Sequence, residues 1–246
     1  MNRLGDADER PHPPGPSSAW SETWEWRLVV DDGSLAVAVV LIRRPAERRI
    51  SYLCSAFGQG RHTVSVVEHD IELPRRDSLE LRASGIWADH ICEQPFSHWT
   101  LGLEAFGLAL DDPDDAVGHG RGVRTPMGLD VEWEDDAPPV AWEGSHGYLA
   151  AGRAHGEVLV GSEHHDVEGA GMRMHRWGTG PRLVPWGGRG DRLRLGSEQW
   201  QGSEVARATA DDGTGEVVDW LLSVAADDET PASLTSRPRM NGPTRA

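Results

Sequence analysis

The most constraining feature of this sequence is an alternation of apolar and polar side chains with a period of two residues. It is cleanest at Met127, Leu129, Val131 and Trp133, which are separated by a glycine and by acidic residues. Residues 24–30 repeat the pattern and run into an Asp-Asp-Gly turn signal. Such alternation is typical of antiparallel strands with one face in a core and the other in water. We therefore expect an almost entirely β protein.

The rest of the chain supports the same interpretation. Short apolar runs between Gly, Asp and Pro turns predict further strands at 35–42, 50–57, 62–69, 79–86, 88–93, 99–110, 148–160, 164–169, 172–177, 192–195, 200–210 and 216–224. A helix at 101–110 is an alternative there, but two glycines and poor caps favour a strand. Many short strands with frequent turns indicate a sandwich or a barrel.

Both ends of the chain differ in composition from its middle. Residues 11–18 read PHPPGPSS, and residues 225–246 are first acidic and then rich in Pro, Ser and Arg. Neither end has an apolar period, so we expect disordered tails at 1–18 and 225–246 around a folded body. Within that body, two strand-rich halves meet near 111–126.

Charge and composition exclude several classes of protein. The formal net charge of −16 argues against a general nucleic-acid binder, because neutralising phosphates requires a basic face. The sequence contains no lysine, which excludes a Schiff-base lysine and a Walker-A loop. No apolar run could span a bilayer or serve as a signal peptide, so we expect no membrane insertion and a cytoplasmic location. Cys54 and Cys92 are then expected to be reduced, buried thiols.

One stretch of the chain reverses the local charge. It carries Arg173, Arg176, Arg182, Arg189, Arg192 and Arg194, with Asp191 as the only opposing acid. Such a stretch can bind an anionic ligand group through bidentate pairs. Pairing with acidic residues elsewhere in the protein is the alternative that we favour.

Eleven tryptophans stand against three phenylalanines. Each indole brings a large apolar surface and one N–H that requires a partner. These rings form part of a core, or several of them line a cavity for a hydrophobic small molecule, as barrel interiors can. The candidates for a cavity lining are Trp24, Trp26, Trp87, Trp99, Trp133 and Trp177, with Arg173 as a polar contact.

The sequence lacks the common catalytic motifs, such as G-x-S-x-G, H-E-x-x-H and C-x-x-C. A metal site built from histidine and a carboxylate is one alternative, although the spacing matches no template and no metal ligand is predicted. The histidines considered for it are His155, His164, His165 and His175.

A buried carboxylic acid is the other chemical alternative. Burial would raise its pKa, so that it could protonate an alkene or a carbonyl while aromatic faces stabilise the cation. The candidate acids, on strand faces that are expected to point inward, are Glu25, Asp89, Glu93, Glu104 and Glu157.

Three segments resemble a known family. They are 22–26 (ETWEW), 85–100 (GIWADHICEQPFSHWT) and 169–178 (GAGMRMHRWG). Over 22–186 the chain is similar to the hydroxyneurosporene synthase (carotenoid 1,2-hydratase)/AttH-like family, in an uncharacterised actinobacterial branch. The family pattern in the third segment is close to G-x-G-x-R-D-H-x-W-G. His175 and Trp177 match it, whereas Met174 stands where the family has aspartate.

The resemblance implies two lipocalin-like (calycin-type) antiparallel β units packed together, which we place at 19–115 and 116–224. It also implies a pocket for a hydrophobic polyene, no required organic cofactor, and hydration or cyclisation chemistry. The aspartate missing at 174 would remove the carboxylate expected to orient the motif histidine. Together with the residue-based candidates, the expected catalytic set is His175, Glu93, Asp89, Glu157 and His155.

Three functions stay open at this point. The leading hypothesis is a cofactor-independent cyclase or hydratase whose cavity holds an isoprenoid or polyketide in a reactive conformer, for proton-initiated or pericyclic chemistry. A non-catalytic carrier of a hydrophobic small molecule is the second. A metal enzyme with histidine ligands is the third.

Overall fold

The computed structural model describes residues 4–32, 34–57, 62–75, 78–111, 121–141 and 146–179, and the backbone of strands at 188–189, 192–195, 198–201, 203–211 and 217–224. The all-β prediction is confirmed, because the one helical element among these residues is a single 3-10 turn, η1 (Asp6–Glu9). The strands are β1 (Trp20–Val30), β2 (Ala36–Arg44), β3 (Arg49–Phe57), β4 (Val64–Glu72), β5 (Leu79–Ala83), β6 (Ile86–Gln94), β7 (His98–Leu110), β8 (Gly122–Asp135), β9 (Val140–Ala141), β10 (His146–Val160), β11 (Glu163–Thr179), β12 (Gly188–Arg189), β13 (Arg192–Leu195), β14 (Glu198–Gln201), β15 (Ser203–Asp211) and β16 (Val217–Val224).

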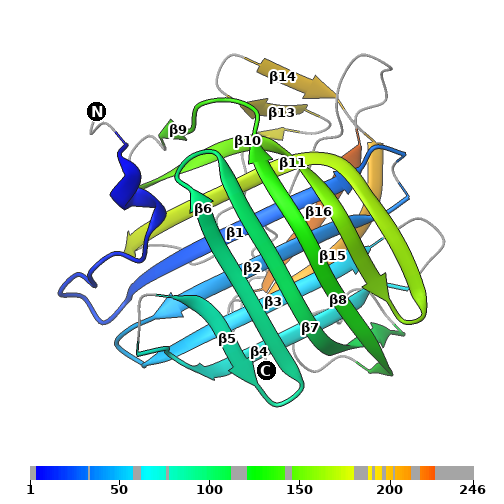
Figure 1. Ribbon diagram of the computed structural model, residues 1–246, viewed down its shortest axis with the longest axis horizontal. Coiled ribbons are helices and arrows are strands. Elements are labelled where there is room, and N and C mark those ends of the chain that lie inside the picture. The colour runs from blue at the N-terminus through cyan, green and yellow to red at the C-terminus, as the bar shows by residue number, and fades with distance from the viewer. Residues whose placement is uncertain are drawn as a thin grey trace, which may run out of the picture.

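The first eleven strands form one antiparallel sheet that closes on itself. Its order is β4-β3-β2-β1-β11-β10-β8-β7-β6-β5, with β9 paired to β10. β4 also pairs with β7, through Val64–Ala109 and Ser65–Leu108, so the hydrogen bonding runs in a ring. Figure 1 shows the result as two layers of strands that cross at an angle. This is a lipocalin-like barrel, in which β6 and β5 extend the sheet beyond the ring.

Two local predictions meet different outcomes. The segment 101–110 is a strand, within β7, as its glycines favoured. The separate strands predicted at 164–169 and 172–177 are wrong, because one continuous strand, β11, spans both. A Cβ placed on Gly171 would lie 1.9 Å from the Arg27 carbonyl oxygen. The glycine therefore permits a close approach of β11 to β1 and does not mark a turn.

The ring draws on both of the units expected from the sequence. β8, β10 and β11, which follow the expected boundary at 115/116, complete the ring begun by β1 to β4 and β7. Residues 19–115 therefore do not close a barrel by themselves. The boundary itself lies in 112–120, and the expected tail lies at 225–246, both outside the described residues. The later strands form two small sheets, β12-β13-β14 and β15-β16.

The expected disordered N-terminal tail is wrong for residues 4–18. η1 and the segment after it, blue in Figure 1, contact the barrel where β1 begins and β11 ends. Glu9 is 1% exposed, although every other side chain of the segment is exposed or only partly buried. Polar contacts hold this segment in place. The order of this segment could not be predicted from its composition, because polar contacts leave no apolar period in the sequence.

The barrel interior is a packed core. Trp24, Trp26 and Leu28 project into it from β1, and Trp99 and Trp133 project into it from β7 and β8. The opposite face of β1 is also buried, and there Glu25 forms an ion pair with Arg27. No helix within the described residues is long and apolar enough to cross a membrane.

Candidate functional site

Polar side chains converge at the end of the barrel where β1 starts. In the strand register Glu22 lies opposite Trp177, and Trp24 lies opposite His175. On the other side of β11, His175 lies opposite Tyr148 of β10. Because side chains alternate along a strand, Glu22, Trp24, His175 and Trp177 share one face. The N-terminal segment adds Asp8, Glu9 and His12 to the same end.

Three of these residues bring potential metal-ligating atoms together. Glu22 Oε1 lies 2.7 Å from His12 Nδ1 and 3.0 Å from His175 Nε2, and all three atoms lie within 4.8 Å of one another. The Glu22 and His175 side chains are fully buried, whereas the His12 side chain is 17% exposed. The group, called here the His–Glu–His cluster, is therefore reached from the His12 side.

Asp8 holds the far nitrogen of both imidazoles. His175 Nδ1 donates to the Asp8 carbonyl oxygen at 2.7 Å, and His12 Nε2 lies 3.3 Å from Asp8 Oδ1. Ligating histidines in proteins usually donate their second N–H to a carbonyl or a carboxylate in this way. The second oxygen of Glu22, Oε2, accepts from Arg43 Nη1 at 3.1 Å. Each member of the cluster is thus oriented by a contact outside it.

The hydrogen-bond directions have a consequence for His175. A carbonyl oxygen only accepts, so Nδ1 of His175 carries the proton, and in the neutral ring Nε2 then presents a lone pair to Glu22 Oε1. Burial lowers the pKa of His175, and the contact with Glu22 offsets only part of that effect. Two facing lone pairs repel at this distance. The arrangement therefore requires a proton or a metal cation between these atoms.

The pKa values of the other two members, Glu22 and His12, are shifted in favour of their charged forms. Burial raises the pKa of Glu22, but hydrogen bonds with His12 and His175 outweigh it, and the pKa lies below its usual value. Burial lowers the pKa of His12, but Glu22 and Asp8 together raise it above its usual value. Glu22 is therefore a carboxylate at neutral pH, the form that accepts protons and binds metals.

Two tryptophans cover the cluster. The Trp24 ring stacks on His175 with 4.3 Å between the ring centroids, and Trp177 stacks on His12 at 3.7 Å. Both were expected to line a hydrophobic cavity. The structure places them against the imidazoles of the polar cluster.

A second buried group lies beside the first, around Arg173. Its guanidinium pairs with Glu9 of the N-terminal segment and with Asp135 of β8. Tyr148 donates its hydroxyl hydrogen to Glu9 Oε2 at 2.7 Å, and the Phe96 N–H donates to Glu9 Oε1 at 2.9 Å. The favoured alternative for Arg173, pairing with acids of the protein, is thus observed. The side chains of Arg182, Arg189, Arg192 and Arg194 lie outside the described residues.

The remaining predicted tryptophans are core residues or surface residues. Trp26, Trp99 and Trp133 are 1% exposed or less, and the Trp133 indole N–H donates to Asp135 Oδ1. Trp87 is 38% exposed, on the outer face of β6. Its expected place in a cavity lining is wrong, because strand alternation turns it away from its buried neighbours Ile86 and Ala88.

The predicted acids do not point into the barrel. Glu93, Glu104 and Glu157 are exposed, as is His155, and Asp89 shares the outer face of β6 with Trp87. Glu25 is buried, but on the face opposite Trp24. Their expected inward direction is wrong, because both faces of several strands carry apolar residues and the alternation alone does not tell them apart.

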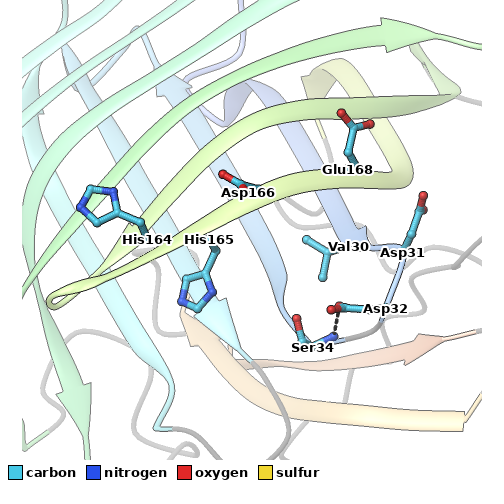
Figure 2. Close-up of a pocket in the computed structure, with 8 residues that line it drawn as sticks. All are labelled: Val30, Asp31, Asp32, Ser34, His164, His165, Asp166 and Glu168. Carbon is cyan, nitrogen blue, oxygen red and sulfur yellow. Dashed lines mark hydrogen bonds between the residues drawn. The ribbon is translucent and has the colours of Figure 1, made fainter.

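His164 and His165 lie at the other end of β1 and β11. They line a pocket of about 400 Å³ with Asp31, Asp32, Asp166 and Glu168. Figure 2 shows this pocket beside the turn after β1, where the Ser34 N–H donates to Asp32 Oδ1. The four histidines considered for the alternative metal site are therefore not together, because only His175 belongs to the His–Glu–His cluster.

The family model described as a domain of unknown function (DUF7064) matches residues 5–184 of the chain. The chain belongs to this family. No curated protein and no solved structure matches it significantly. The matched range of the DUF7064 domain contains the N-terminal segment, the closed ring and every residue of both buried polar groups.

Within this DUF7064 domain, residue 174 does not lie where a side chain could orient His175, contrary to what the resemblance implied. Met174 lies between Arg173 and His175 on β11, opposite Glu25, so its side chain is on the other face of the strand. A carboxylate there would not reach His175. Glu22 and the Asp8 carbonyl orient that imidazole, so the absence of aspartate at 174 leaves His175 oriented.

Sequence reasoning missed His12, Asp8 and Glu9, which lie in the segment taken for a tail. It also missed Glu22 and Tyr148. One signal was available for Glu22, which precedes Trp24 by two residues and so shares its face in the alternating strand. No local signal linked it to His12, ten residues earlier, or to His175, 153 residues later.

Proposed function

We propose that this protein binds one divalent transition-metal ion through His12, Glu22 and His175, and that the ion activates a water molecule for a hydration or hydrolysis reaction. The observation that carries the proposal is the convergence of two imidazole nitrogens on one carboxylate oxygen, with both outer nitrogens held by Asp8. Two histidines and one carboxylate are a ligand set used by catalytic zinc and by non-haem iron(II).

Two of the three separations between the candidate ligand atoms suit such an ion. Bonds of about 2.1 Å from a metal to nitrogen or oxygen place neighbouring ligands of an octahedron about 3 Å apart. Glu22 Oε1 is 2.7 and 3.0 Å from the two nitrogens. A cation between these atoms would replace the repulsion of facing lone pairs by attraction. Three protein ligands leave coordination positions for water, whose pKa a bound Zn²⁺ lowers to about 7.

Metal binding tests the proposal directly. Protein stripped with a chelator should bind one equivalent of Zn²⁺ in calorimetry, and Co²⁺ should give the visible absorption of a nitrogen and oxygen site. His12→Ala should weaken binding by more than about 100-fold, since changes outside the ligand shell alone cost about 10–100-fold. His12 is partly exposed, so this variant should fold normally by circular dichroism.

His155→Ala is the matched control, because His155 is exposed and lies outside the cluster. It should bind Zn²⁺ like the wild type. Equal affinity in His12→Ala and the wild type, or no stoichiometric binding by the wild type, would reject the metal proposal.

A metal-free cyclase or hydratase acting on a hydrophobic polyene is the second candidate. The stacking of Trp24 on His175 and of Trp177 on His12 favours it, because aromatic faces beside a proton donor can stabilise a carbocation. In that reaction the cluster would donate a proton to the polyene. Turnover of a polyene that survives complete removal of metal would favour this candidate over the first.

A further inference from the structure

The Glu9 carboxylate occupies a site with four hydrogen-bond donors. Arg173 donates from Nη2 to Oε1 at 2.5 Å and from Nη1 to Oε2 at 3.1 Å. The Tyr148 hydroxyl donates to Oε2 at 2.7 Å, and the Phe96 backbone N–H donates to Oε1 at 2.9 Å. Both carboxylate oxygens thus receive two donors each. A bidentate arginine with further donors is how proteins recognise a carboxylate selectively.

The barrel builds this site without help from the N-terminal segment. Tyr148 comes from β10, Arg173 from β11, and Phe96 from the turn between β6 and β7. Arg173 is held separately by Asp135, which also accepts the Trp133 indole N–H. Phe96 has a φ of 54°, a left-handed conformation that is uncommon for an aromatic residue. The receiving groups are therefore fixed by the barrel itself.

The occupant, in contrast, arrives on a lightly held segment. Glu9 is the one buried side chain between residues 4 and 18, and the helical part of the segment is a single turn. The other anchors are polar contacts of Asp8 and His12 with β1, β2 and β11, and the stacking of His12 on Trp177. Release of the segment would break these contacts, and would leave Arg173 with Asp135 and the Tyr148 hydroxyl.

We propose that Arg173, Tyr148 and the Phe96 N–H form a carboxylate-binding site that Glu9 fills in this conformation, and that accepts a small monocarboxylate when the N-terminal segment moves away. The ligand class follows from the donors, which match a planar, singly charged carboxylate. None of the three donors belongs to the His–Glu–His cluster, but His12 and Asp8 lie on the same segment as Glu9, so a metal bound to His12 would oppose release of the segment.

Chemical rescue of Glu9→Ala tests the proposal. The variant removes the occupant and should lower Tm. Sodium acetate should then raise its Tm in a saturable way, by about 3 °C at 100 mM for a Kd near 10 mM. Acetamide, which has the same shape without the charge, and sodium chloride at equal ionic strength should not. The wild type should respond to none of the three, because Glu9 competes from within the chain.

Two further variants sharpen the test. The double variant Glu9→Ala/Tyr148→Phe loses one donor, so its Kd for acetate should rise by about tenfold. If Glu9→Ala does not fold, Glu9→Gln replaces it, since its amide keeps the shape and acetate should still displace it from Arg173. A folded variant at position 9 whose Tm responds to acetate no more than to acetamide would overturn the proposal, whatever the outcome of the metal titrations.

Discussion

Acidification should destabilise this protein through one core histidine, His90. It projects from β6 into the barrel interior, is 3% exposed, and lies beside the rings of Trp26 and Tyr52. Neither of its ring nitrogens has a hydrogen-bond partner among the described residues. Burial lowers its pKa to about 4. The imidazole is therefore neutral in the folded protein above about pH 4. Between that pH and its unfolded pKa, it takes up a proton readily only when the protein unfolds.

The size of the effect follows from the two pKa values. The unfolded value is about 6.5, so the unfolded chain binds a proton that the folded chain rejects between about pH 6.5 and pH 4. The contribution of His90 to stability is complete above pH 6.5 and falls as the pH drops through that window. At about pH 4.5 the loss amounts to about 2.5 kcal/mol.

Urea unfolding of the wild type and His90→Phe, at about pH 7.5 and pH 4.5, measures this loss. All other titrating groups are common to the two proteins. The difference between their free energies of unfolding should therefore change by about 2.5 kcal/mol, in favour of the variant, between the higher and the lower pH. His155→Phe, at an exposed position, should track the wild type. Parallel pH dependences of the wild type and His90→Phe would refute the reasoning, because they would mean that the core accepts the imidazolium.

Three further outcomes follow from the same structure. Trp24→Ala, which removes a ring that is 1% exposed and stacks on His175, should lower the free energy of unfolding by about 3–5 kcal/mol in urea titrations. Gly171→Ala should cost about 3 kcal/mol, because the new methyl group would meet the Arg27 carbonyl, whereas Gly5→Ala, with nothing within 4 Å, should be nearly neutral in the same assay. Burial raises the pKa of the Cys54 thiol and raises that of Cys92 to about 12. Neither thiol should therefore react quickly with a disulfide reagent at pH 8 unless the protein is unfolded, and a rapid reaction of the native protein would contradict this.

Much of the local structure could be predicted from the chain alone. Alternation at 127–133 and at 24–30 predicts β8 and β1, because a strand with one face in a core must repeat every two residues. Turn residues placed the ends of most strands within a few positions. The segment 101–110 could be argued as a helix, but its two glycines and poor caps favoured the strand that forms there, β7. The same alternation could not show which face of β6 points inward, and so misplaced Trp87 and Asp89.

The candidate site was predictable in part. The segment 169–178 contains Arg173, His175 and Trp177, all on one face of β11, and these residues do lie at the polar end of the barrel. Glu22 could have been added from its spacing to Trp24. His12 and Glu9 could not, because a segment held by a few hydrogen bonds has the composition of a free tail.

The sequence by itself determined that this chain forms strands and turns, because backbone alternation and turn propensities act between residues that are near neighbours in the chain. Only the tertiary structure decided that β4 meets β7 to close a ring, and that Glu22 meets His12 and His175. It alone placed the Glu9 carboxylate on Arg173. These contacts join positions as far as 164 residues apart. Their geometry depends on strand register and closure, which no local pattern encodes.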